Sequence, residues 1–223
     1  MTDHGLKNID AEDIEDLIAK VEVSFNIKFI KDELIHIRTF GQLCNHISNK
    51  IQLENSDDCT SQQAFYKLRK AISTTLQIEH NKITPDTSLN DLFPRTTRRS
   101  KVKILEQHLA FDLNILRPPH LITNGLLLTL FISFVGLFFN WKFGLSGLGL
   151  SILGLWLGNK VANELDLQTV AQIAKKMTSE NYFQSRRNPK TFNKSEIENI
   201  LTDWFSNNLG LDKGELTRHT EFV

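Results

Sequence analysis

Two long apolar runs stand in the middle of a chain whose other segments alternate between apolar and polar positions. Leu121–Phe139 and Phe143–Gly158 hold no charged residue, and Lys142 lies between them. At 1.5 Å per residue, runs of this length approach the roughly 30 Å of a bilayer core. We therefore expect a two-helix transmembrane hairpin over residues 120–159; a buried hairpin of a soluble domain is the alternative.

Outside these runs, apolar residues recur at intervals of three and four, which predicts amphipathic helices. The predicted helices cover Asp10–Phe25, Thr39–Ile51, Gln62–Ile78, Thr97–Phe111, Thr169–Met177 and Lys194–Leu209. Ser195 and Glu198 have the spacing of a capping box at the start of the last helix. The expected fold class is all-α.

Basic residues are concentrated on both flanks of the hairpin and are rare in its connecting loop. They are Arg95, Arg98, Arg99, Lys101, Lys103 and Arg117 before it, and Lys160, Lys175, Lys176, Arg186 and Arg187 after it. The positive-inside rule then places both termini in the cytoplasm. Neither run carries an ionisable residue, which favours an anchor over an ion path. The lipid bilayer is thus an expected partner.

Small residues recur four apart in the second apolar run, as Gly147-xxx-Ser151 and Gly154-xxx-Gly158. Such spacing lets helix backbones approach closely. These residues could pack the hairpin against itself, or they could form a homodimer interface.

Composition argues against several classes of function. The 26 basic and 26 acidic residues cancel, so no nucleic-acid partner is expected. Two cysteines, Cys44 and Cys59, make no disulfide framework, and no Cys/His cluster has metal-ligand spacing. We find no phosphate loop or nucleophile elbow. We expect no catalytic residue, no metal and no cofactor.

Two short segments recur along the chain. Thr39-Phe-Gly-Gln-Leu43 resembles Thr169-Val-Ala-Gln-Ile173, and Ile83-Thr-Pro-Asp-Thr-Ser-Leu89 resembles Leu216-Thr-Arg-His-Thr-Glu-Phe222. Two copies of one small helical unit would explain both recurrences.

These units resemble the acyl carrier protein fold, a small four-helix bundle that carries phosphopantetheine on a serine. The chain also resembles bacterial membrane proteins with acyl-carrier-like segments, which implies a multi-pass protein of the bacterial inner membrane. The resemblance implies a unit A, circularly permuted from the two chain ends, and a unit B that contains the hairpin. The implied divisions are unit A helices at 1–53, a linker at 54–61, the first part of unit B at 62–119, the hairpin at 120–159, the last helix of unit B at 160–183, a linker at 184–193, and the first helix and loop of unit A at 194–223.

The positions that match the carrier serine are degenerate. In unit A, Asp10-Ala11-Glu12 stands where the carrier motif has Asp-Ser-Leu, and Ala11 has no hydroxyl to modify. In unit B the matching stretch includes Thr96, which follows a basic residue instead of an acidic one. Both units therefore depart from a working carrier.

The helices at these two positions differ in the sign of their charge. The acidic set is Asp10, Glu12, Asp13, Glu15 and Asp16, and the basic set is Arg95, Arg98, Arg99, Lys101 and Lys103. These sets could be solvated faces, the basic set could contact anionic lipid headgroups, or one unit could dock on the other. We treat both sets as a possible interaction face for a protein partner.

Three functions remain open. The first is a non-catalytic, membrane-anchored interaction or scaffold protein with degenerate acyl-carrier-like domains. The second is a membrane-tethered acyl carrier modified at an unrecognised serine or threonine. The third is an unrelated helical enzyme anchored by the hairpin.

Overall fold

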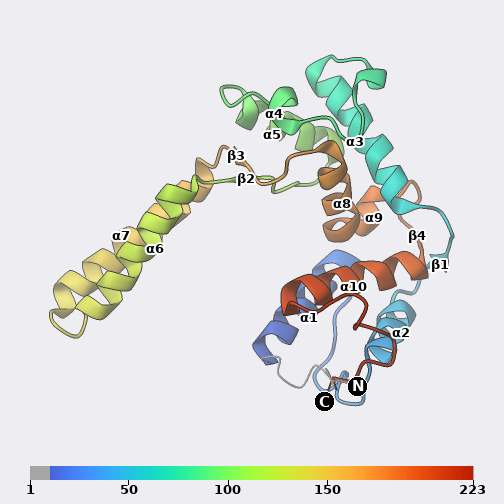
Figure 1. The fold of residues 1–223 in the computed structure, drawn as a ribbon, viewed down its shortest axis with the longest axis horizontal. Coiled ribbons are helices and arrows are strands. Elements are labelled where there is room, and N and C mark those ends of the chain that lie inside the picture. The colour runs from blue at the N-terminus through green and yellow to red at the C-terminus, as the bar shows by residue number, and fades with distance from the viewer. Residues whose placement is uncertain (1–10, 223) are drawn as a thin grey trace. The chain divides into compact units, whose positions relative to one another are not determined.

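The computed structural model describes residues 11–222, and helices dominate it, which confirms the all-α class. The helices are α1 (Ala11–Phe25), α2 (Phe40–Lys50), α3 (Thr60–Leu76), η1 (His80–Lys82), α4 (Leu89–Leu92), α5 (Arg98–Leu109), α6 (His120–Gly136), α7 (Trp141–Lys160), α8 (Val170–Glu180), α9 (Tyr182–Ser185) and α10 (Lys194–Leu209). Four two-residue strands accompany them: β1 (Glu54–Asn55), β2 (Leu116–Arg117), β3 (Glu164–Leu165) and β4 (Thr191–Phe192). β1 pairs with β4 in parallel, and β2 pairs with β3 antiparallel (Figure 1).

The chain divides into two compact units, which we call unit 1 and unit 2. Unit 1 comprises Met1–Lys67 and Ala174–Val223, and unit 2 comprises Leu68–Ile173. The boundaries fall inside α3 and α8, so each of these helices contributes to both units. Kinship of either unit with acyl carriers stays a prediction.

The core of unit 1 forms between α1, α2 and α10. Each helix buries one apolar stripe there, as its spacing predicts. Buried members include Leu17, Val21 and Phe25 of α1, Phe40, Leu43 and Ile47 of α2, and Ile197, Leu201 and Phe205 of α10. The rings of Phe40 and Phe205 pack edge to face with centroids 5.4 Å apart. This core draws on both ends of the chain.

A second apolar cluster lies within unit 2. α5 buries Val102, Leu105 and Leu109 on one side. Further fully or almost fully buried side chains come from α4 and the connecting segments, namely Ile83, Leu89, Phe93, Leu113 and Ile115. Ala110 follows α5 in the left-handed conformation (φ 65°), which ends the helix.

Both units contain the same helix cap. In unit 1, the Gln42 amide donates to Thr39 Oγ1 (3.3 Å) and the Thr39 amide donates to Gln42 Oε1 (3.2 Å), which makes a capping box for α2. In unit 2, Thr169 and Gln172 make the same two bonds at 3.4 and 3.3 Å at the start of α8. The repeated sequence thus has a repeated structure.

The second recurring segment also makes equivalent bonds. The Thr217 amide donates to Thr220 Oγ1, and the Thr84 amide donates to Thr87 Oγ1, both at 2.8 Å. The first amide of α2 then donates to the Thr220 carbonyl, and the first amide of α8 donates to the Thr87 carbonyl. Each copy therefore joins the turn to its capped helix in the same way.

A third equivalence is found after α1 and α5. Glu22 Oε1 accepts from the Phe29 amide at 2.6 Å, and Glu106 Oε1 accepts from the Leu113 amide at 2.8 Å. In both cases a helical glutamate accepts from the amide seven residues further on. α1 and α5 thus end in the same local structure.

The two units differ in the connection from these amides to the next capped helix. Residues 30–38 form a short loop before the capped helix of unit 1, whereas residues 114–168 lead from Leu113 to the capped helix of unit 2. The α6–α7 hairpin lies within this longer connection. It is therefore an insertion into a loop of a repeated helical unit.

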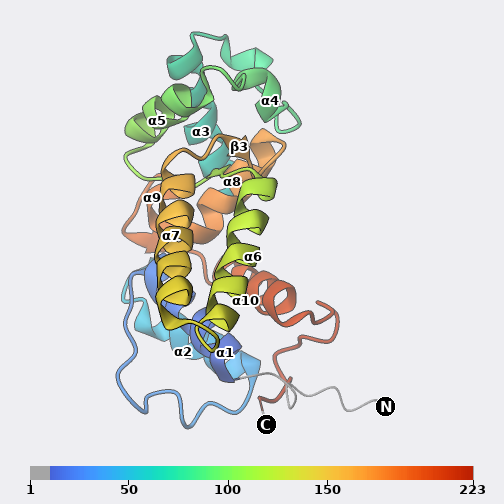
Figure 2. The same cartoon turned by 90° about the vertical axis from the view of Figure 1, so that its left-hand side faces the viewer.

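α6 and α7 lie side by side as an antiparallel pair, which both ribbon views show (Figures 1 and 2). However, no helix among residues 11–222 is long and apolar enough to cross a membrane. α6 has 17 residues, and α7 has 20 residues that include Lys142, Lys160 and several glycines. The expectation of a transmembrane hairpin, and with it of a multi-pass inner-membrane protein with both termini in the cytoplasm, is therefore wrong.

Candidate functional site

The hairpin exposes large apolar side chains on several sides of both helices. At the connection between the helices, Phe138 and Phe139 are 82% and 88% exposed. Other exposed side chains are Leu121, Ile122, Leu127, Leu128, Phe131, Ile132, Phe134, Val135, Trp141, Phe143, Leu145, Leu150, Ile152, Leu153, Trp156 and Leu157. An exposed apolar surface of this extent marks an interaction site.

Small residues of α7 form the contact with α6. A Cβ atom added to Gly144 would lie 2.6 Å from the backbone nitrogen of Leu137, and one added to Gly147 would lie 2.2 Å from Ser133 Oγ. The same test places a Cβ on Gly154 2.7 Å from Leu126 Cδ2. A larger side chain at Gly144 would therefore push the two backbones apart, whereas at Gly147 and Gly154 it would first displace the side chains of Ser133 and Leu126.

The predicted small-residue set consists of Gly147, Ser151, Gly154 and Gly158. Ser151 is buried, and Gly147 and Gly154 pack against α6. Gly158 is the most open of these glycines, with the nearest atom to its added Cβ at 3.8 Å on Pro118. Gly147 and Gly154 therefore pack the hairpin against itself, and a homodimer through the set stays a prediction.

Three hydroxyl groups on the hairpin donate within their own helices, whereas the buried Ser151 Oγ has no hydrogen-bond partner among the described residues. Thr129 Oγ1 donates to the Gly125 carbonyl at 2.6 Å, and Ser133 Oγ donates to the Thr129 carbonyl at 2.7 Å. Ser146 Oγ donates to the Phe143 carbonyl at 3.0 Å. These hydroxyls therefore need no water to complete their hydrogen bonds.

Two strand segments and two ion pairs close the base of the hairpin. β2 and β3 place Arg117 directly opposite Glu164. Arg117 pairs with Asp166 at 2.5 Å, and Arg95 pairs with Glu164 at 3.3 Å. The base is thus held by backbone pairing and by opposite charges.

Arg98, predicted as part of the basic face, is 6% exposed. Its guanidinium donates to the Phe93 carbonyl (2.9 Å), the Asn163 carbonyl (2.8 Å) and Asn90 Oδ1 (2.8 Å). Burial lowers the pKa of Arg98 below its usual value. Arg98 joins the base of the hairpin to α4 and α5 and is not available for a partner.

The other basic residues lie in or beside α5. Arg99 donates to the Lys160 carbonyl, and Arg95 is exposed apart from its pair with Glu164. Lys101 is half-buried and Lys103 is exposed. The predicted basic face is therefore divided between structural contacts and the surface.

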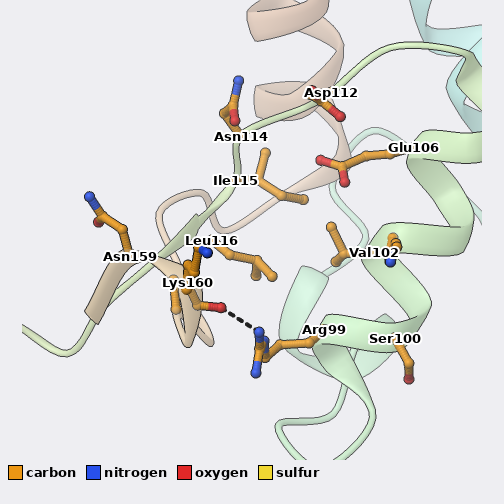
Figure 3. Close-up of a pocket in the computed structure, with 12 residues that line it drawn as sticks. Arg99, Ser100, Val102, Glu106, Asp112, Asn114, Ile115, Leu116, Asn159 and Lys160 are labelled. Carbon is orange, nitrogen blue, oxygen red and sulfur yellow. Dashed lines mark hydrogen bonds between the residues drawn. The ribbon is translucent and has the colours of Figure 1, made fainter. Parts of the chain in front are cut away.

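A pocket of about 500 Å³ lies beside this base, between α5, the segment around β2, and the end of α7 (Figure 3). Arg99, Lys103 and Lys160 supply its cationic groups, and Glu106 and Asp112 supply its carboxylates. The remaining lining residues are Ser100, Val102, Asn114, Ile115, Leu116, Asn159 and Ala162. The sequence patterns did not indicate this pocket.

The acidic face lies on α1 in unit 1. Glu12, Asp13, Glu15 and Asp16 belong to this helix, and Asp10 lies outside the described residues. Glu12, Asp13, Glu15 and Asp16 are all exposed. Ala11 is the first residue of α1. The carboxylates of α1 are therefore available to a partner.

Thr96, which the acyl-carrier resemblance predicts as the degenerate attachment position of unit B, is exposed in the turn that precedes α5. Its hydroxyl is therefore accessible from solvent.

A buried polar cluster in unit 1 escaped the sequence analysis. Arg186 is 3% exposed, and its Nη1 donates to Thr60 Oγ1 (2.5 Å), Tyr182 Oη (3.1 Å) and Glu196 Oε2 (3.5 Å). Glu196 Oε1 also accepts from the Thr60 amide at 2.7 Å, which caps α3. Burial raises the pKa of Tyr182. No local pattern links residues 60, 182, 186 and 196, and all four are occupied with one another.

Catalytic chemistry finds little support among residues 11–222. No group of three His, Cys, Asp or Glu residues there could hold a metal ion. Cys44 is buried, and burial raises the pKa of its thiol to about 12, which disfavours the reactive thiolate. His46 pairs with Glu33 at 2.8 Å. The absence of an enzyme activity stays a prediction.

The α6–α7 hairpin with its charged base is therefore the candidate interaction site. Comparison of the chain with protein-family models, with curated proteins and with solved structures found no match.

Proposed function

We propose that this protein is a non-catalytic interaction protein that attaches to lipid through the α6–α7 hairpin. The observation that carries the proposal is the exposure of large apolar side chains on several sides of both helices. In this proposal the hairpin enters the apolar layer from one face of a bilayer, and neither helix crosses it. Both ends of the hairpin then remain at the same surface.

The distribution of the exposed side chains favours lipid over a single partner helix. A partner helix covers one stripe, whereas a helix that is apolar all round matches an apolar surrounding. Phe131 and Ile132 of α6 are 64% and 60% exposed, and Leu150 and Ile152 of α7 are 70% and 60% exposed. Successive positions of this kind point in different directions around each helix.

The polar groups of the hairpin also support the proposal. Backbone groups inside a helix are paired within that helix, and the hydroxyls of Thr129, Ser133 and Ser146 donate to carbonyls of their own helices. Lys160 Nζ lies 3.7 Å from the ring centroid of Trp156 at the end of α7. Aromatic and basic side chains are enriched where apolar lipid meets water.

The scaffold part of the proposal rests on the repeated helical unit. In the acyl-carrier resemblance, Ala11 lacks a hydroxyl at the attachment position. We propose that the two units are degenerate carrier-like modules that present protein-binding surfaces, and that the exposed carboxylates of α1 form one of them. Their acidic charge would select a basic surface on the partner.

Co-flotation with neutral phosphatidylcholine vesicles tests lipid attachment. A variant with Phe138→Ser, Phe139→Ser and Trp141→Ser should lose at least about 100-fold in partition, because each inserted large side chain contributes roughly 1.5–3 kcal/mol. A matched control, Val23→Ser with Ile30→Ser, removes side chains that are 81% and 74% exposed in unit 1 and should bind as the wild type does.

Equal flotation of the wild type and the three-residue variant would contradict the proposal. A different result would assign the hairpin to a second copy of the chain. In that case the wild type would dimerise in sedimentation as its concentration rises, the same variant would not, and neither would bind vesicles.

A carrier function is the second candidate, because Thr96 is exposed in the turn before a helix. Co-expression with a phosphopantetheinyl transferase should then add the mass of one phosphopantetheine group to the wild type and not to Thr96→Ala. An unchanged intact mass would exclude modification at this residue by the transferase used.

A further inference from the structure

The pocket beside the hairpin base has a basic end and an acidic end. Figure 3 shows the Arg99 guanidinium at the backbone carbonyl of Lys160, with Glu106 and Asp112 at the other end of the pocket. Lys103 follows Arg99 by one helical turn of α5 and also lines the pocket. An anion at the basic end would therefore meet cations from two segments of unit 2.

The basic end is held in place by contacts that leave donors for a ligand. A guanidinium has five N–H donors, and one of those on Arg99 bonds to the Lys160 carbonyl. The Lys160 ammonium lies over the exposed Trp156 ring at the end of α7. Arginine and lysine arranged in this way are suited to a phosphate group.

The two carboxylates do not cancel the positive charge at the basic end of the pocket. Glu106 Oε1 accepts from the Leu113 amide at 2.8 Å, so its charge is engaged by the backbone. Asp112 is exposed to solvent at the far end. Three cations and two carboxylates line the pocket, which leaves a positive balance.

Apolar side chains also line the pocket, beside its charged groups. Its lining includes Val102, Ile115, Leu116 and Ala162, and it ends at Asn159 and Lys160, where the apolar surface of α7 begins. A volume of about 500 Å³ is within the range of pockets for small ligands and headgroups. A ligand with a phosphate beside an acyl chain matches both features.

We infer that this pocket binds the phosphate of an anionic phospholipid headgroup, while the hairpin contacts the acyl chains of the surrounding lipid. The inference rests on the proposed lipid attachment and adds the headgroup class to it. Arg99, Lys103 and Lys160 hold the phosphate, and Asn114 and Asn159 offer amide donors at the pocket wall.

Vesicle partition of the full chain tests the inference, with phosphatidylcholine alone compared with a mixture containing phosphatidylglycerol. Lys103→Gln with Lys160→Gln should reduce the preference for phosphatidylglycerol by roughly 25-fold, because each cation near an anionic surface contributes about fivefold. The matched control, Lys82→Gln with Lys101→Gln, removes two cations of unit 2 that lie outside the pocket. It should keep most of the preference.

Three outcomes would overturn the inference. Equal losses in both double variants would assign the preference to diffuse surface charge, and an unchanged preference in the pocket variant would exclude the pocket. A preference abolished by inorganic phosphate at constant ionic strength would assign the pocket to a free anion.

Failure of lipid attachment itself would be seen separately. If the hairpin does not attach to lipid, replacing Phe138, Phe139 and Trp141 will leave binding to pure phosphatidylcholine unchanged. The pocket variants, in contrast, should keep that binding even if the hairpin does attach.

Discussion

Single residues of this protein show how burial changes the role of a charge. Arg98 begins α5, where a basic side chain would ordinarily face solvent, yet it is buried and makes three hydrogen bonds. Its acceptors include two backbone carbonyls, from residues 93 and 163, that a shorter or apolar side chain would leave unpaired. Its role is therefore to hold structure together.

Replacing this arginine should cost stability. Arg98→Met should lower the free energy of unfolding by about 2–4 kcal/mol, because buried acceptors lose a charged donor. Chemical denaturation of the full chain measures the loss. Lys101→Met on the same helix is the control and should change the free energy by about 0.5 kcal/mol or less. Equal effects in the two variants would contradict a structural role for Arg98.

Glu33 provides a residue-scale prediction about pH. Its carboxylate accepts from Lys50 Nζ at 2.6 Å and from the Ile30 amide at 2.8 Å, and these bonds lower its pKa to about 2. Because the folded pKa is below that of the unfolded chain, the stabilisation is present above about pH 4.3 and is lost as the pH falls toward 2.

The test compares Glu33→Gln with the wild type in denaturation at several pH values. Their difference in unfolding free energy should be constant near neutral pH and should shrink between about pH 4.3 and about pH 2. Lys50→Met removes the main hydrogen-bond donor to Glu33. Its difference from the wild type in unfolding free energy should also shrink in this pH window. A difference that does not vary with pH would rule out this linkage.

At the scale of elements, the local sequence signals differ in how well they locate helix ends. The box predicted at Ser195 is not used, because Asn193 is the N-cap of α10 and accepts from the Glu196 amide at 3.2 Å. Gly210 ends the same helix in the left-handed conformation (φ 64°), which glycine adopts without strain. Neighbouring residues compete for a cap, and the tertiary contacts select one of them.

The helix pair of the hairpin permits a matched glycine test. Gly144→Ala would place a Cβ 2.6 Å from the Leu137 backbone nitrogen and should destabilise the pair by about 1–3 kcal/mol. Gly149→Ala meets nothing within 4 Å and should stabilise α7 by up to about 1 kcal/mol. Amide hydrogen exchange in α6 and α7 should therefore speed up in the first variant and slow in the second. Slower exchange in both would show that the helices do not pack closely at Gly144.

At the scale of the whole molecule, the chain consists of two units with one repeated set of hydrogen bonds. The hairpin occupies, in unit 2, the place of the loop at residues 30–38 in unit 1. An insertion at a loop adds a surface without changing the core to which the loop is attached. This explains how an apolar hairpin and a repeated set of caps occur in the same unit.

The insertion should be removable. β2 and β3 pair Arg117 with Glu164, so an Asn-Gly turn in place of residues 118–163 can close an antiparallel hairpin. The shortened chain should keep protected amides in α5 and α8, lose about 1–2 kcal/mol with the bond from Arg98 to the Asn163 carbonyl, and lose vesicle binding. Hydrogen exchange and flotation measure these outcomes. Loss of protection throughout α5 and α8 would show that the hairpin is required for the fold of unit 2.

The sequence by itself determined the all-α class, the positions of the longer helices and the place of the apolar hairpin, whereas the short helices α4 and α9 were not predicted. These properties follow from local periodicity and composition, because a helix of 11 to 20 residues carries its own apolar stripe or apolar run. The repeated Thr-x-x-Gln segments could be read in the same way, since a capping box lies within four consecutive residues.

Only the tertiary structure decided the burial of Arg98, the cluster of Arg186 with Thr60 and Glu196, and the pocket at the hairpin base. It also overturned the expected membrane crossing, because helix boundaries and not the apolar run set the length available. The physical reason is separation along the chain. Arg98 bonds to a carbonyl 65 residues away and Glu196 caps a helix 136 residues away, and local patterns carry no information about such contacts.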